Sequence, residues 1–183
     1  MLNLSLPAGF AVIILSGLTA QAADTGFAAR NAKLLEAERV TLLRNIQAAH
    51  GYSEEQVSAL GAILGASPRT GQGTPEITRH PVSGAQCRER LKAEGIRYES
   101  EANRMACGGR PYMVPISDSV CIDQFEFPNI PCDFPVTWIS TKNAALACES
   151  VGKRLCDAHE WEGACAGRVD EAADVGDVLL EQA

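Results

Sequence analysis

The fold of this chain depends on the stretch Gly152-Lys153-Arg154-Leu155-Cys156-Asp157-Ala158-His159-Glu160-Trp161-Glu162-Gly163-Ala164-Cys165. Gly152 follows an Ala-rich run and can adopt the positive φ that ends a helix. Asp157 is a favourable N-cap residue, and Glu160 follows three positions later, which is the spacing of a capping box. We therefore predict a short helix after Asp157. Trp161 lies on its apolar face, where a large aromatic is expected in the core.

The residues before this stretch predict two short strands and a second helix. Residues 120–127 alternate in part and indicate an irregular strand, which the prolines at 128, 131 and 135 prevent from continuing. Residues 136–139 predict another short strand. Ser140 or Thr141 is expected to cap a helix through Val151, with Leu146 and either Cys148 or Ala145 facing inward.

Four ordered segments resemble the formylglycine-generating enzyme (sulfatase-modifying factor) family. The stretch at 152–162 is similar to its Gly-Lys-Arg-Leu-Pro-Thr-Glu-x-Glu-Trp-Glu segment, and residues 121–129 to its Ile-Asp-x-x-Glu-Val-Thr-Asn strand. Residues 135–140 resemble Pro-Val-x-x-Val-Ser, and residues 144–148 resemble Ala-x-x-Tyr-Cys. Residues 113–116 correspond to the opening strand. The resemblance covers residues 113–167, which match the first half of the family's domain.

This resemblance implies a fold and a set of structural residues. The expected fold is α+β and loop-rich, a partial C-type-lectin-like domain preceded by a helical hairpin. The resemblance implies that Glu126 holds turns by hydrogen bonds. It implies structural roles, and no catalytic role, for ten residues: Asp123, Glu126, Asn129, Trp138, Gly152, Lys153, Arg154, Leu155, Glu160 and Trp161.

The resemblance also bears on cofactors and activity. In the family, copper is held by a cysteine pair and calcium by backbone and carboxylates, and no segment of this sequence matches either set of ligands. We therefore expect no cofactor in this chain, and a truncated, non-catalytic protein that acts as a structural or binding module. The alternative is a fragment of a formylglycine-generating copper oxidase that acts on a substrate cysteine. Family membership does not by itself confer activity.

The N-terminus indicates export. Residues 1–22 have an apolar centre at 10–15 and the small-x-small sequence Ala20-Gln21-Ala22, which are typical of a cleaved signal peptide, although Lys and Arg are absent before the apolar run. The apolar run is too short for a good membrane span. We therefore predict a periplasmic or extracellular protein without a membrane anchor after cleavage.

Between the signal and the family-like region, two helices are predicted. An apolar stripe at helical spacing indicates a helix over 27–49, and Ser53 with Gln56 forms a capping box that opens a second. We expect these apolar faces to be core. The predicted organisation is a signal at 1–22, a helical hairpin region at 23–66, a linker at 67–82, the family-like domain at 83–167, which opens with a short helix over 84–94, and a divergent acidic tail at 168–183.

Seven cysteines favour disulfides in an exported chain: Cys87, Cys107, Cys121, Cys132, Cys148, Cys156 and Cys165. The odd number leaves at least one unpaired within the chain. We expect Cys87 to pair with Cys107, Cys121 with Cys132, and two of the last three with each other. A zinc or redox module built on the last three with His159 is the alternative, although the sequence has no Cys-x-x-Cys. Cys156, near Arg154 and a helix N-terminus, is the candidate reactive thiol.

The charge balance bears on partners. The chain has a net charge of −7, which argues against nucleic acid and anionic membranes, because both attract basic patches. Half of a domain would expose sheet edges and core residues. We therefore expect the helical hairpin, disulfides, a protein partner or a second copy of the chain to cover them.

Overall fold

The computed structural model describes residues 14–166, with side chains from residue 26 onward. The described part is mostly helical with one small two-stranded antiparallel sheet, so its class is α+β with few strands. The elements are α1 (Ile14–His50), α2 (Glu54–Gly65), α3 (Gly84–Ala93), α4 (Glu101–Ala106), β1 (Met113–Pro115), β2 (Cys121–Asp123), α5 (Thr141–Ser150) and α6 (Ala158–Ala166).

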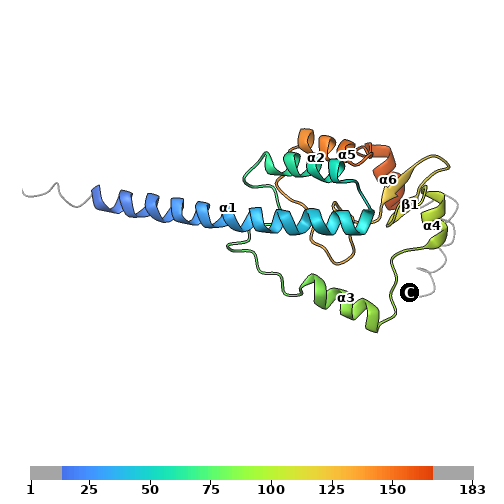
Figure 1. Cartoon of the computed structure of the whole chain (residues 1–183), viewed down its shortest axis with the longest axis horizontal. Helices are drawn as coiled ribbons and strands as arrows, with labels where there is room; N and C mark the ends of the chain where they lie inside the picture. The colour runs from blue at the N-terminus through green and yellow to red at the C-terminus, as the bar shows by residue number, and fades with distance from the viewer. Residues whose placement is uncertain (1–13, 167–183) are drawn as a thin grey trace, which may run out of the picture.

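One hydrophobic core joins the N-terminal helices to α5. The core contains six residues that are at most 3% exposed: Leu42 and Ile46 of α1, Leu60 and Leu64 of α2, and Ala147 and Val151. Figure 1 shows α2 and α5 side by side, with α1 passing beneath them and extending beyond the other elements at its N-terminal end. The predicted apolar faces of the first two helices are therefore core, as expected.

Local capping explains where several helices begin. Ser53 and Gln56 form the predicted reciprocal box at the start of α2, and Ser83 with Gln86 forms a second one at the start of α3. The hydroxyl of Ser140 accepts the N–H of Asn143 at the start of α5. Each cap satisfies backbone N–H groups that lack a partner inside the first turn.

The inward face of α5 differs from the prediction. Ala147 and Val151 are the residues at its core, whereas Leu146 is 39% exposed. Successive residues of a helix are rotated by about 100° around its axis. A prediction that is wrong by one position therefore places an outward residue on the inner face. The Ala-rich sequence of α5 gives little contrast between these faces.

The sheet is smaller than predicted. β1 and β2 pair antiparallel, with Val114 opposite Ile122. The predicted strand over 136–139 is wrong, because Thr137 forms only an isolated bridge with Gly71 and the left-handed φ of 58° at Trp138 interrupts extended backbone.

The turn-rich segment 67–82 is fixed to the loop before α5. Thr70, which is 2% exposed, donates its hydroxyl to the carbonyl of Trp138 at 2.9 Å. Gln72 Nε2 donates to the carbonyl of Phe134 at 2.6 Å. Together with the bridge between Gly71 and Thr137, these bonds attach the segment at three points to residues 134–138.

Two predictions fall partly or wholly outside the described residues. These are the signal peptide, of which only residues 14–22 are described, as part of α1, and the acidic tail at 168–183. Among the described residues, none of the helices combines the length and the apolar composition that a membrane crossing requires.

Candidate functional site

An open groove with a volume of about 1090 Å³ lies between the β1–β2 hairpin and α6. The hairpin contributes apolar side chains such as Val114, Ile122 and Phe125. The opposite wall is formed by the loop from Gly152 to Cys156 and by α6, with Trp161. Residues from two of the segments singled out in the sequence, 121–129 and 152–162, therefore border the same groove.

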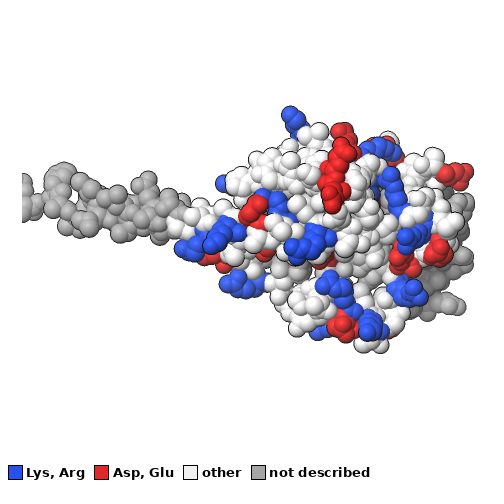
Figure 2. All heavy atoms as spheres, viewed as in Figure 1, with Lys and Arg blue, Asp and Glu red and all other residues white. Residues whose placement is uncertain are grey.

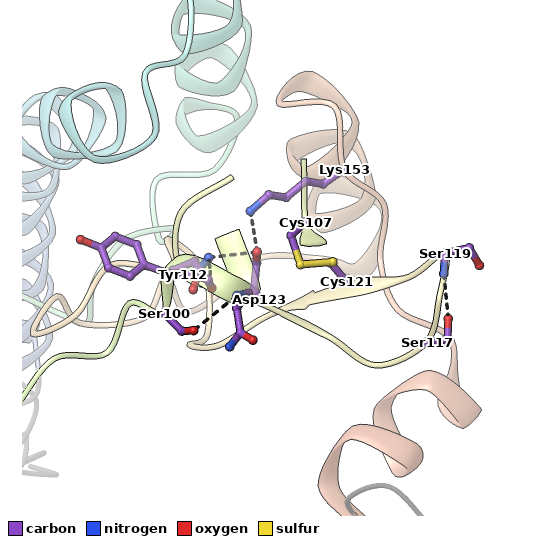
Figure 3. The surroundings of a disulfide bond; sticks show 10 residues. Ser100, Cys107, Tyr112, Ser117, Ser119, Cys121, Asp123 and Lys153 are labelled. Carbon is purple, nitrogen blue, oxygen red and sulfur yellow. Dashed lines mark hydrogen bonds and ion pairs between the residues drawn. A yellow bond between two sulfur atoms is a disulfide. The ribbon is translucent and has the colours of Figure 1, made fainter. Parts of the chain in front are cut away.

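A polar cluster of Asp123, Asn129 and Lys153 holds the groove's two walls together. Lys153 Nζ donates to Asp123 Oδ1 at 2.6 Å, and Asn129 Nδ2 donates to the same oxygen at 3.0 Å. Figure 3 shows Lys153 approaching Asp123 beside the disulfide of Cys107 with Cys121. The cluster connects the loop after α5 to β2, so the sequence-predicted residues Asp123, Asn129 and Lys153 meet in space.

Asn129 is the residue that organises the turn after β2. It is 0% exposed and has a φ of 58°, a conformation that Asn tolerates better than most residues. Its Nδ2 also donates to the carbonyl of Tyr112 at 3.0 Å, and its Oδ1 accepts the N–H of Phe125 at 3.1 Å. The turn-holding role expected of Glu126 is thus performed by Asn129, whereas Glu126 is exposed and contributes its backbone carbonyl to the N–H of Asn129.

Arg154 and Glu160 form a two-pronged ion pair at the groove's edge. Arg154 Nη1 donates to Glu160 Oε2 at 2.6 Å, and Nη2 donates to the other carboxylate oxygen. Glu160 Oε2 also accepts the N–H of Asp157, whose carboxylate accepts the N–H of Glu160 in return, as the predicted capping box requires. Hydrogen bonds from Arg154 lower the pKa of Glu160 to about 2.

Three apolar residues expected to be structural are exposed. Trp161 is 59% exposed, so the prediction that it lies in the core is wrong within the described part of the chain. Leu155 is 40% exposed beside it, and Trp138 is 66% exposed away from the groove's lining. The face of α6 that carries Trp161 lines the groove and is not covered by another described element.

The predicted disulfide pairing is also wrong. The structure pairs Cys87 with Cys132 and Cys107 with Cys121. The first of these joins α3, which has no buried residue, to the loop before α5. In the chain-entropy model, closing its 45-residue span stabilises the fold by about 4 kcal/mol. The disulfide therefore compensates for an apolar contact that α3 lacks.

Cys148, Cys156 and Cys165 carry free thiols, and all three line the groove. Cys148 is half-buried, whereas the other two are exposed. Burial, with a smaller effect of the Asp123 carboxylate, raises the pKa of Cys148. Burial, followed by the Glu160 carboxylate, raises the pKa of Cys156, and the Arg154 guanidinium opposes this only in part. Neither thiol is therefore activated as a nucleophile.

The described residues contain no cluster of ligands that would support the zinc alternative. No three His, Cys, Asp or Glu side chains in this part of the chain are grouped so that they could hold a metal ion. His159 is exposed in the first turn of α6. The cysteines near it therefore do not form the four-ligand arrangement of a structural zinc site.

A pair of aromatic side chains near the groove was not identified from the sequence. His50 at the end of α1 stacks on Tyr52 with ring centroids 5.1 Å apart, and His50 Nε2 donates to the carbonyl of Pro128 at 2.9 Å. Burial lowers the pKa of His50 and raises the pKa of Tyr52 to about 12. The break in the helical pattern at Gly51 was the available signal that these rings turn back onto the core.

Charges on the molecular surface do not form a single-sign patch on the face seen in Figure 2, where basic and acidic side chains are interspersed. Within the groove, the basic residues Arg110, Lys153 and Arg154 accompany the acidic residues Asp123, Glu126 and Glu160. Two of the three bases are paired to acids there. The groove therefore combines apolar walls with a largely neutralised rim.

Comparisons of the chain with protein-family models, with curated proteins and with solved structures found no match.

Proposed function

We propose that this chain is an exported, sulfatase-modifying-factor-like protein whose groove between β1–β2 and α6 binds a polypeptide. One observation carries the proposal. Side chains from two of the segments that resemble that family, 121–129 and 152–162, line one open groove in which Trp161 is 59% exposed. A large exposed aromatic in an apolar groove is typical of a binding surface.

The shape of the groove favours a polypeptide over a small molecule. Its volume of about 1090 Å³ is open along one side, at the upper limit of ordinary ligand pockets. In the described residues β2 pairs only with β1, and an extended polypeptide that adds a strand to a short sheet is a common mode of peptide binding. Ile122 and Trp161 are among the apolar side chains that line the groove for such a segment.

The disulfides also support the proposal. The two disulfides are typical of proteins from oxidising compartments, which agrees with export to the periplasm or the extracellular space. The proposal includes no copper or calcium, because the sequence lacks segments that resemble the family's ligands. The C-type-lectin-like arrangement remains part of this proposal.

Fluorescence of Trp161 provides the test. The Trp138→Phe variant leaves Trp161 as the single tryptophan, and it would be titrated with an array of extended peptides that alternate apolar and polar residues. We expect a blue shift of its emission with the peptides that bind. The Trp161→Phe variant, which keeps Trp138, is the matched control and should show no shift.

Two outcomes would overturn the proposal. One is equal peptide binding by the wild type and by a Trp161→Ala variant, because the groove would then not be the binding surface. The other combines two results: no peptide binds, and the protein sediments as a stable dimer in which Trp161 is already protected from solvent. The groove would then be the contact surface for a second copy of the chain.

A further inference from the structure

The three free thiols differ in what they can reach. Cys165 lies in the last turn of α6, whereas Cys156 precedes that helix. At a rise of 1.5 Å per residue, the helix separates them by about 10 Å along its axis. A disulfide needs Cα atoms within about 7 Å, so these two cysteines cannot pair unless α6 unwinds.

Cys148 and Cys156 are placed differently, because the chain folds back between them. The carbonyl of Cys148 accepts the N–H of Val151 at 3.1 Å and that of Lys153 at 2.9 Å, and Gly152 has a φ of 70°. These bonds close the C-terminal turn of α5 and bring the backbone N–H of Lys153 against the carbonyl of Cys148. Cys156 follows only three residues after Lys153, and both cysteines line the groove.

Asp123 relates the two thiols to each other. It is anchored to Lys153 between them, at 2.6 Å. Burial is the main cause of the raised pKa of Cys148 and of Cys156, and the Asp123 carboxylate adds a smaller effect at each. The segment from Arg154 to His159 is exposed, so its approach to α5 displaces no buried side chain.

We propose that Cys148 and Cys156 form a third, reversible disulfide that fixes the loop of residues 149–155 in the wall of the groove. The oxidant is a low-molecular-weight disulfide such as oxidised glutathione. The Cys156 thiolate, at the exposed position, attacks one sulfur of this disulfide and releases one thiolate, which takes up a proton. Cys148 then loses its proton and attacks Cys156 Sγ, which releases the second thiol.

The net reaction converts two protein thiols and one small disulfide into one protein disulfide and two small thiols. Cys165 remains a thiol in this scheme. Because neither thiol is activated, closure is slow at neutral pH and becomes faster as the pH rises towards the thiol pKa values. The reaction does not depend on whether the groove binds a polypeptide, so the two proposals fail separately.

The test starts with the full chain, with its two disulfides intact and its three thiols free. It is incubated with oxidised glutathione, then alkylated without reductant and weighed. We expect the number of alkylated thiols to fall from three to one. In the Cys165→Ser control it should fall from two to none, and in the Cys148→Ser variant Cys156 should be recovered as a glutathione adduct.

Peptide mapping identifies the bond. Trypsin cuts after Lys142, Lys153, Arg154 and Arg168, so the expected product is peptide 143–153 linked to peptide 155–168. A second cleavage after Glu160 or Glu162 separates Cys156 from Cys165 and assigns the sulfur. Three alkylated thiols after oxidation, a bond from Cys165, or a bond between two chains would overturn the proposal.

Discussion

Lys153 Nζ lies 2.6 Å from Asp123 Oδ1, and the two side chains are only 11% and 25% exposed. Asn129 donates to the same carboxylate oxygen from the other side. The contact joins the loop after α5 to β2 and so fixes the distance between the two walls of the groove. It is the most buried of the ion pairs found in the described residues.

Removing Lys153 should therefore destabilise the fold. The Lys153→Met substitution keeps an unbranched side chain that is one atom shorter but leaves the Asp123 carboxylate partly buried without its cation, which we expect to cost about 2 kcal/mol. The measurement is urea unfolding followed by circular dichroism. Lys142→Met, at an exposed lysine of α5, is the control and should change the free energy of unfolding by less than about 0.5 kcal/mol. Equal effects of the two substitutions would contradict the importance of the pair.

Glu160 should make the stability depend on pH on the acid side. Its pKa is lowered from 4.5 to about 2, first by hydrogen bonds from Arg154. The contribution is complete above the unfolded value of about 4.5 and is lost as the pH falls towards the folded value. In Glu160→Gln the decrease in stability between about pH 4.5 and pH 2 should be smaller than in the wild type. Thermal unfolding measured at several pH values tests this.

The control for this prediction is Glu162→Gln, which changes an exposed carboxylate on the same helix. It should leave the acid-side slope as it is in the wild type. A Glu160→Gln variant with the wild-type slope would show that the pair with Arg154 does not contribute to the fold.

How much of the fold was predictable depends on the range of each interaction. The capping pairs Ser53 with Gln56 and Asp157 with Glu160 lie within four residues, so a sequence pattern alone identified them. The capping box at Ser83 has the same signature. The disulfides depend on contacts across 14 and 45 residues, and seven cysteines allow many pairings that local patterns do not distinguish.

The candidate site was predictable as a list of residues but not as a surface. Asp123, Asn129 and Lys153 were selected through the resemblance, and the structure brings them together. Periodicity placed Trp161 on the apolar face of its helix, but periodicity does not tell whether another element covers that face. The groove exists because the described residues leave this face open.

Tyr52 should ionise at unusually high pH. Its pKa is raised to about 12, mainly because the phenol is buried against the core. Absorbance of the phenolate should show an ionisation step near pH 12 that belongs to Tyr52. The unfolded side chain ionises near pH 10. The free energy of unfolding should therefore fall between about pH 10 and pH 12, because in this range the unfolded state releases the proton that the folded state still holds.

The Tyr52→Phe variant distinguishes this residue from Tyr98 and Tyr112. It should remove the step near pH 12 from the absorbance titration. A folded wild type without a step near pH 12, or a Tyr52→Phe variant that keeps it, would show that Tyr52 is not buried in the way that the structure describes.

Gly84 should not tolerate a side chain, although it lies in an exposed helix. A Cβ built on Gly84 would lie 2.7 Å from the backbone carbonyl oxygen of Cys132, the cysteine that anchors α3 through its disulfide. That backbone cannot give way as a flexible side chain would. We expect Gly84→Ala to lower the free energy of unfolding by about 1 to 3 kcal/mol.

Gly163→Ala is the matched control for Gly84→Ala, because nothing lies within 4 Å of a Cβ built at this position. Alanine there should stabilise α6 by about 0.5 to 1 kcal/mol. Opposite signs in the two denaturation curves confirm that α3 lies against the loop of Cys132, whereas stabilisation by both substitutions would show that this contact is absent in solution.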